Sequence, residues 1–135
     1  MPLLAAVIVP PAGATVEDLV ARRPDICLLS ARDAVRGIEL ARAALPDVIL
    51  MDINLPGISG LQALRILAQD ASTAHIPVMA LSANAVPSDI AKGLEAGFFR
   101  YLTKPIKVNE FMETLDVALK FAGQQASRTV RKEPL

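Results

Sequence analysis

Short apolar runs alternate with longer amphipathic stretches along this chain, and no segment repeats. Each run is short enough for a strand and rich in Val, Ile, Leu or aromatic residues, which is typical of buried β-structure. Parallel strands covered on both faces are apolar throughout, whereas half-exposed strands alternate with polar residues. The pattern therefore predicts a buried parallel sheet made from Leu3–Val9, Ile26–Leu29, Val48–Met51, Ile76–Leu81 and Phe99–Leu102.

The stretches between these runs carry apolar residues at helical spacing. They predict helices over Thr15–Arg23, Asp33–Leu45, a segment capped by Ser59, Pro87–Gly97 and Val108–Phe121. In the second helix the predicted buried stripe consists of Val35, Ile38, Ala41 and Leu45. Five strand–helix units in succession predict an α/β fold, a doubly wound five-stranded parallel sheet with helices on both faces.

The chain has 135 residues, the size of one domain. We expect this domain to span residues 1–122, because residues 123–135 are mostly polar or charged and lack a period, which predicts a disordered tail or linker. The fourteen basic and fourteen acidic residues balance, so no basic surface points to direct nucleic-acid binding. No apolar run reaches the roughly 18 residues that a membrane span needs.

The single cysteine, Cys27, lies in an apolar run, and we expect it to be a buried strand residue rather than a reactive thiol. With no second cysteine the chain has no internal disulfide, which suits a reducing cytoplasm. The single histidine, His75, matches no catalytic pattern, and we interpret it as a surface residue.

Polar side chains follow three of the predicted strands where each strand ends. Asp52 follows the third strand, Ser82 the fourth, and Lys104 lies just after the fifth. Sites in open α/β sheets lie beyond these carboxyl ends. A carboxylate that accepts a phosphoryl group needs a cation, a hydroxyl donor and a divalent ion beside it. Asp52 could be the accepting carboxylate, Lys104 the cation and Ser82 the hydroxyl donor. The backbone carbonyl of Asn54 could bind the metal.

Each of these residues also has an ordinary structural interpretation. An aspartate at a strand end is often a turn or cap residue. Taken singly, Lys104 would be a solvated loop charge, Ser82 a turn residue and Tyr101 a half-buried strand aromatic. Their joint placement at one edge of the sheet favours a functional site.

Three motifs stand in this order along the chain: DVILMDINLPG at Asp47–Gly57, ALSANA at Ala80–Ala85 and YLTKP at Tyr101–Pro105. With them, the stretch Asp47–Lys120 resembles the receiver domain of two-component response regulators and of hybrid histidine kinases. The resemblance implies a flavodoxin-like (βα)5 fold and a signalling rather than enzymatic role.

The resemblance also implies roles for single residues. Asp52 would be the phosphoacceptor, Ser82 the switch hydroxyl, Tyr101 the switch aromatic and Lys104 the phosphate-binding lysine, with a cis bond before Pro105. The expected cofactor is Mg²⁺, and the expected partner is a histidine kinase or histidine phosphotransferase.

An output surface is implied on the fourth helix, fifth strand and fifth helix, over Ala85–Ala96, Phe99–Leu102 and Val108–Lys120. Lys92, Glu95, Arg100 and Glu110 supply charges there that could pair across the two-fold axis of a homodimer. The alternative is that these charges form an ordinary solvated face.

The first strand departs from the family. Receivers normally end it with two adjacent acidic residues that complete the magnesium site. Lining up Pro11 and Ala12 with the family's loop places Ile8 and Val9 at those positions, and no acidic residue precedes Glu17. We expect Glu17 to lie on the first helix, turned away from the site. Magnesium affinity should therefore be low.

Two main functions remain open. The function that the extensive match favours is a phosphorelay receiver that accepts a phosphoryl group on Asp52. The alternative, which the missing acidic pair suggests, is a pseudoreceiver, a protein-interaction module that works without phosphorylation. An aspartyl phosphohydrolase is disfavoured because Asn54 stands where that class usually has a second aspartate. A flavodoxin-like cofactor binder is disfavoured because no Gly-rich loop follows the first strand.

Overall fold

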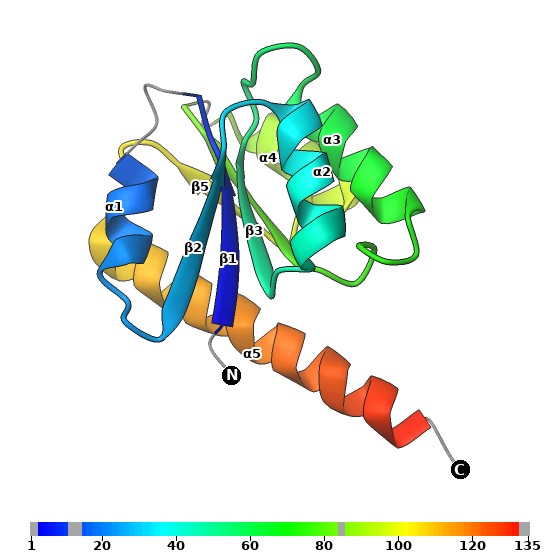
Figure 1. Ribbon diagram of the computed structural model, residues 1–135. Coiled ribbons are helices and arrows are strands. Elements are labelled where there is room, and N and C mark those ends of the chain that lie inside the picture. The colour runs from blue at the N-terminus through cyan, green and yellow to red at the C-terminus, as the bar shows by residue number, and fades with distance from the viewer. Residues whose placement is uncertain (1–2, 11–14, 84–85, 133–135) are drawn as a thin grey trace.

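A computed structural model describes residues 3–10, 15–83 and 86–132 of the chain. Within them, five strands alternate with five helices (Figure 1). In chain order these are β1 (Leu3–Ile8), α1 (Thr15–Ala21), β2 (Ile26–Ala31), α2 (Ala34–Ala44), β3 (Val48–Asp52), α3 (Gly60–Gln69), β4 (Val78–Ser82), α4 (Pro87–Ala96), β5 (Arg100–Thr103) and α5 (Val108–Lys132). The predicted succession of strands and helices is confirmed, with most ends shifted by a few residues.

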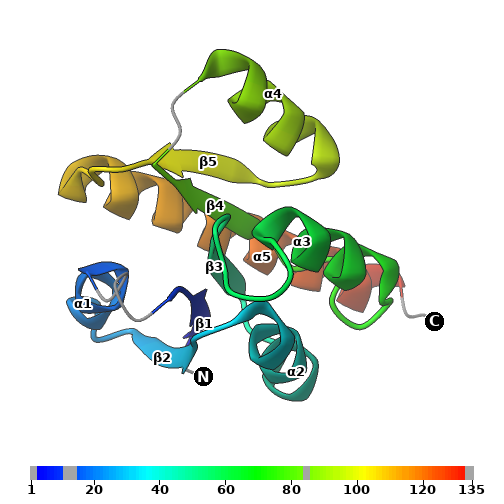
Figure 2. The ribbon, with the colours of Figure 1, turned by 90° about the horizontal axis from the view of Figure 1, so that it is seen from above.

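The strands form one parallel sheet in the order β2-β1-β3-β4-β5. Helices α1 and α5 cover one face, and α2, α3 and α4 lie on the other (Figures 1 and 2). The sheet thereby divides the hydrophobic core in two. One cluster packs Phe111 and Leu115 of α5 against the sheet, and the other packs Ile38 of α2 and Leu64 of α3 against the opposite face. The predicted doubly wound α/β fold is confirmed.

The two central strands are buried along their whole length, as solid apolar runs predict. All five residues of β3 and all five of β4 are buried, including Asp52 and Ser82 at their ends. Helix α3 begins with a capping box in which Ser59 and Gln62 satisfy each other's backbone N–H groups. Helix α4 ends at Ala96 and is capped by Gly97, whose φ of 123° favours glycine.

Two predictions about burial are wrong. Cys27 is exposed, because β2 is an edge strand in which only the two end residues, Ile26 and Ala31, are buried. Val35 and Leu45 are 57% and 50% exposed instead of belonging to the buried stripe of α2. The face of α2 that is buried comprises Ala34, Gly37, Ile38 and Ala41, so the helix is turned to bring its smallest residues against the sheet.

Helix α5 is longer than predicted. It was expected to end near Phe121, but its backbone continues to Lys132 and extends past the end of the sheet (Figure 1). The assignment of residues 123–135 to a separate tail stays a prediction, though the helical backbone to Lys132 differs from a disordered one. Across the described residues, no helix is long and apolar enough to cross a membrane.

Candidate functional site

The side chains singled out by sequence converge at the carboxyl edge of the sheet. Asp52 ends β3 and pairs in register with Leu81 of β4, while Ser82 pairs with Thr103 of β5. The next residue, Lys104, donates its backbone N–H to the Ser82 carbonyl at 2.8 Å. Parallel strands finish at one edge, so three segments distant in sequence meet there.

Asp52 and Lys104 form a close ion pair. The Lys104 Nζ lies 2.6 Å from Asp52 Oδ2, and the backbone N–H of Asn54 donates to Asp52 Oδ1 at 2.9 Å. The Asp52 side chain is only 3% exposed, whereas that of Lys104 is 36% exposed. Both oxygens of this buried carboxylate are therefore already engaged. The peptide bond between Lys104 and Pro105 is cis, as predicted.

Ser82 and Tyr101 lie on the strands β4 and β5. Ser82 is 2% exposed, and Tyr101 is half-buried on β5. The Tyr101 ring packs against Gly93 of α4, where an added Cβ would lie 3.0 Å from two ring carbons. The absence of a side chain at Gly93 therefore lets the ring approach α4. Residues Asn84 and Ala85 of the second motif lie outside the described residues.

The described end of β1 is packed with apolar side chains. Ile8 and Val9 are both 0% exposed, and the pairing of Ile8 with Met51 brings Val9 level with Asp52. The Ile8 side chain fills the space over Gly37 of α2, where an added Cβ would lie within 2.5 Å of it. Val9 belongs to the core on the opposite face of the sheet. Two well-packed apolar residues thus lie at the level of Asp52, where the sequence analysis expects the acidic pair of the family.

The nearest acidic residue along the chain does not substitute for the missing pair. Glu17 accepts hydrogen bonds from the Ser30 hydroxyl and from Arg32 Nη1. Burial raises the pKa of Glu17, but these two hydrogen bonds and the Arg32 charge outweigh it and hold the pKa below its usual value. Glu17 therefore serves to tie α1 to the end of β2.

The donor set does not fit magnesium. No group of three or more His, Cys, Asp or Glu side chains in the described part of the chain could hold a metal ion. Asp52 is the carboxylate that the structure places at this edge among the described residues, and it is paired with Lys104. Magnesium usually binds through one or two carboxylates together with phosphate oxygens and water. The apolar side chains of Ile8 and Val9 provide no oxygen ligand.

The model of the response regulator receiver domain family matches residues 13–116 of this chain. The chain belongs to this family. The matched region begins after β1.

Comparison with curated proteins finds response regulators as relatives of this receiver. The polar-differentiation response regulator DivK of Brucella anthropi is 42% identical over 84 residues, which are 62% of this chain and 68% of DivK. The DivK protein of Brucella ovis matches to the same extent.

Solved structures give the same result. The receiver domain of the sensor histidine kinase PA1611 from Pseudomonas aeruginosa is 27% identical, with a TM-score of 0.76 over 91% of this chain and 99% of that one. That structure is described with a magnesium ion coordinated in its active site cleft. A response regulator from Desulfuromonas acetoxidans is 26% identical, with a TM-score of 0.77 over 89% of this chain and 98% of that one.

The sequence analysis did not predict that the Ile8 side chain packs against Gly37. A glycine inside a predicted helix costs up to about 1 kcal/mol relative to alanine, so it usually has a packing reason. That signal was present at Gly37, but only the fold reveals which residue of the sheet fills the space.

Proposed function

We propose that this receiver domain signals by binding partner proteins and does not switch through magnesium-dependent phosphorylation. The observation that carries the proposal is the pair of fully buried apolar residues, Ile8 and Val9, at the level of Asp52. On this proposal the domain is a non-catalytic cytoplasmic signalling module. Its partners belong to two-component pathways, with a histidine kinase or histidine phosphotransferase as the first candidate.

Electrostatics support the proposal. Phosphorylation would turn the Asp52 monoanion into an acyl phosphate with up to two negative charges, a net gain of about one. Among the described residues, Lys104 is the cation that pairs with Asp52. Without a divalent ion, about one negative charge would be left uncompensated beside Lys104 in a buried setting, which is costly. The Asp52–Lys104 pair then acts as a permanent structural tie between β3 and the segment after β5.

The second candidate is phosphoryl acceptance on Asp52. It is favoured by the convergence of Asp52, Lys104 and Ser82 at one edge of the sheet. In this case Asp52 would attack the phosphoryl group, Lys104 would neutralise charge on its oxygens, and Ser82 and Tyr101 would respond to it. Only the second candidate forms an acyl phosphate on Asp52, and this product can be measured.

Intact-mass measurement after incubation with acetyl phosphate and magnesium separates these candidates. We expect no mass increase of one phosphoryl group in the wild-type chain or in the Asp52→Asn variant. The PA1611 receiver domain is a suitable positive control for the reagent. A phosphoryl adduct on the wild type that Asp52→Asn abolishes would establish the second candidate and overturn the first.

The partner surface that we propose lies on α4, β5 and α5. Apolar side chains are exposed there, with Leu94 of α4 at 45% and Val108 of α5 at 40%. Arg100 lies in the middle, with its guanidinium 4.5 Å from the ring centroid of Phe99 and one N–H donating to the Phe99 carbonyl. The Phe99 ring in turn packs on Phe121 of α5 at 5.0 Å, which holds the surface together.

Reversing the charge of Arg100 tests this surface. Arg100→Glu should weaken self-association or partner capture by about two- to tenfold, since exposed interface charges contribute modestly. Light scattering and titration of a histidine kinase or phosphotransferase measure the effect. Arg65→Glu, an exposed arginine on α3, is the control. Equal binding by both variants with unchanged melting would rule out this surface.

A further inference from the structure

Helix α5 continues past the base of the sheet, beyond the packing of its own domain. It has 25 residues, which makes it about 37 Å long, and its last part projects away from the other elements (Figure 1). Up to Leu119 it packs against the sheet, through Phe111, Leu115 and Ala118. Most of the stability of a protein helix comes from such packing, so the projecting part would be stabilised by any surface that covers it.

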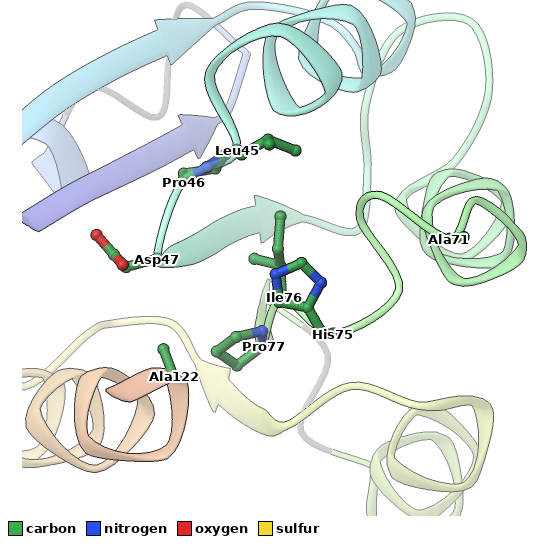
Figure 3. Close-up of a pocket in the computed structure, with 8 residues that line it drawn as sticks. All are labelled: Leu45, Pro46, Asp47, Ala71, His75, Ile76, Pro77 and Ala122. Atoms are coloured by element: carbon green, nitrogen blue, oxygen red, sulfur yellow. The ribbon is translucent and has the colours of Figure 1, made fainter. Parts of the chain in front are cut away.

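The packing of α5 against its own domain becomes open at Ala122. This residue lines a cavity of about 520 Å³ at the end of the sheet opposite to Asp52. Ala122 faces Pro77 across the cavity, and the segments before β3 and β4 form the other walls (Figure 3). An open space therefore lies beside α5 at the residue where the helix leaves the sheet.

The next residue, Gly123, has no packing partner that explains it within the described part of the chain. Glycine is one of the least favourable residues inside a helix, so a glycine in mid-helix usually has a packing reason. A Cβ added at Gly123 would meet nothing within 4 Å, whereas one added at Gly37 of α2 would meet Ile8. Close approach of a second helix from outside the chain would supply the missing reason.

The charges of α5 are divided between its two halves. The charged residues of the first half are all acidic, and those of the second half are all basic: Glu110, Glu113 and Asp116, then Lys120, Arg128, Arg131 and Lys132. The helix dipole favours such charges only in the first and last turns, so it does not account for Asp116 or Lys120. A second α5 in the opposite direction would place each acidic half against a basic half, whereas a parallel one would place like charges together.

One side of α5 has the spacing by which a helix packs along another helix. Steps of four and three residues connect six positions, which we call the outer seam: Glu113, Val117, Lys120, Gln124, Ser127 and Arg131. Glu113 and Lys120 are exposed, and Val117 is 43% exposed. Arg131 follows Glu113 by about five helical turns, so the two positions lie on the same face of the helix.

From these observations we propose that α5 pairs in antiparallel orientation with α5 of a second copy of this chain. The outer seams meet about a two-fold axis at the level of Ala122, and Gly123 beside it lets the two helices approach. Three contacts then repeat on both sides of the axis: Glu113 with Arg131 of the partner subunit, Val117 with Ser127 of the partner subunit, and Lys120 with Gln124 of the partner subunit. A two-fold contact of this kind is closed, so association stops at a dimer.

This dimer stands apart from the function proposed above. It uses the outer seam of α5 and not the surface around Arg100, and it requires no change at Asp52. Val117 is the one large apolar residue of the seam, so the dimer should be weak. Its ion pairs are exposed, so added salt should weaken it further.

Sedimentation equilibrium of the full chain over a range of concentrations tests the proposal. We expect a reversible dimer whose dissociation constant rises about three- to tenfold in Glu113→Arg, because that change places like charges together at both symmetric contacts. Glu39→Arg is the matched control, since Glu39 is an exposed glutamate on α2. It should leave the dissociation constant unchanged.

A charge swap separates the pairing from any effect on folding. Arg131→Glu should weaken the dimer as Glu113→Arg does, and neither change should alter the melting temperature measured by circular dichroism. In an equal mixture of the two single variants, the heterodimer has opposite charges at both contacts, so it should form at least as readily as the wild-type dimer. The double variant with both changes should also recover the dimer.

Three outcomes would overturn the proposal. The first is a chain that stays monomeric at roughly 1 mM, where a weak dimer would be populated. The second is a dimer that Glu113→Arg and Arg131→Glu weaken no more than Glu39→Arg does. The third is a mixture of the two single variants that associates no better than either alone. A dimer that only Arg100→Glu weakens would assign self-association to the surface on α4, β5 and α5 instead.

Discussion

Placing aspartate at both Ile8 and Val9 should lower the free energy of unfolding by about 4 kcal/mol or more. Both side chains are fully buried, and they face the two separate halves of the core. Ile8 also fills the space above Gly37, so its loss leaves a cavity in addition to a buried acid. Urea unfolding of the double variant, followed by circular dichroism, measures the effect.

Val35→Asp is the control for this experiment, because Val35 is an apolar residue of α2 that is 57% exposed. It should change the free energy of unfolding by about 0.5 kcal/mol or less. Where a stabilising osmolyte keeps the double variant folded, calorimetry should find tighter magnesium binding than in the wild type, since each added carboxylate is a ligand. Unchanged magnesium affinity in the folded double variant would show that Ile8 and Val9 are not at the acidic positions.

Replacing Lys104 with methionine should lower the free energy of unfolding by roughly 1–3 kcal/mol. The Asp52 carboxylate is 3% exposed and would lose its counterion. Breaking a fully buried pair costs about 3–5 kcal/mol, and the 36% exposure of Lys104 reduces that figure through solvent screening. Adding Asp52→Asn should recover most of the loss, because the unpaired charge is then removed.

The double-mutant cycle has a matched control in Lys107→Met, an exposed lysine three residues further along. Lys107 has no ion pair within the described residues, so its replacement should cost little. If Lys104→Met were no more destabilising than Lys107→Met, the ion pair between Asp52 and Lys104 would not stabilise the fold. The same conclusion would follow if Asp52→Asn failed to compensate.

The sequence predicted the parts of this fold that depend on local pattern. The solid apolar runs of β3 and β4 located the buried centre of the sheet. Because parallel strands end at one edge, the positions of Asp52, Ser82 and Lys104 after successive runs sufficed to predict their convergence. The ion pair between Asp52 and Lys104 follows from that placement.

Features that depend on the arrangement of whole elements could not be predicted. Cys27 is exposed because β2 lies at the edge of the sheet, and strand order is not encoded in a single apolar run. Val35 and Leu45 fit the helical period of α2, but the helix approaches the sheet through its small residues. The packing of Ile8 against Gly37 joins two elements that no sequence pattern links.

Titration with magnesium and beryllofluoride, an analogue of the aspartyl phosphoryl group, tests the central claim most directly. Tyr101 is the single tyrosine and the chain has no tryptophan, so intrinsic fluorescence reports on the position beside Ser82 and α4. If Ile8 and Val9 have removed the metal site, the Tyr101 signal should show no saturable change with both reagents present. A saturable change that requires magnesium and disappears in Asp52→Asn would contradict this account.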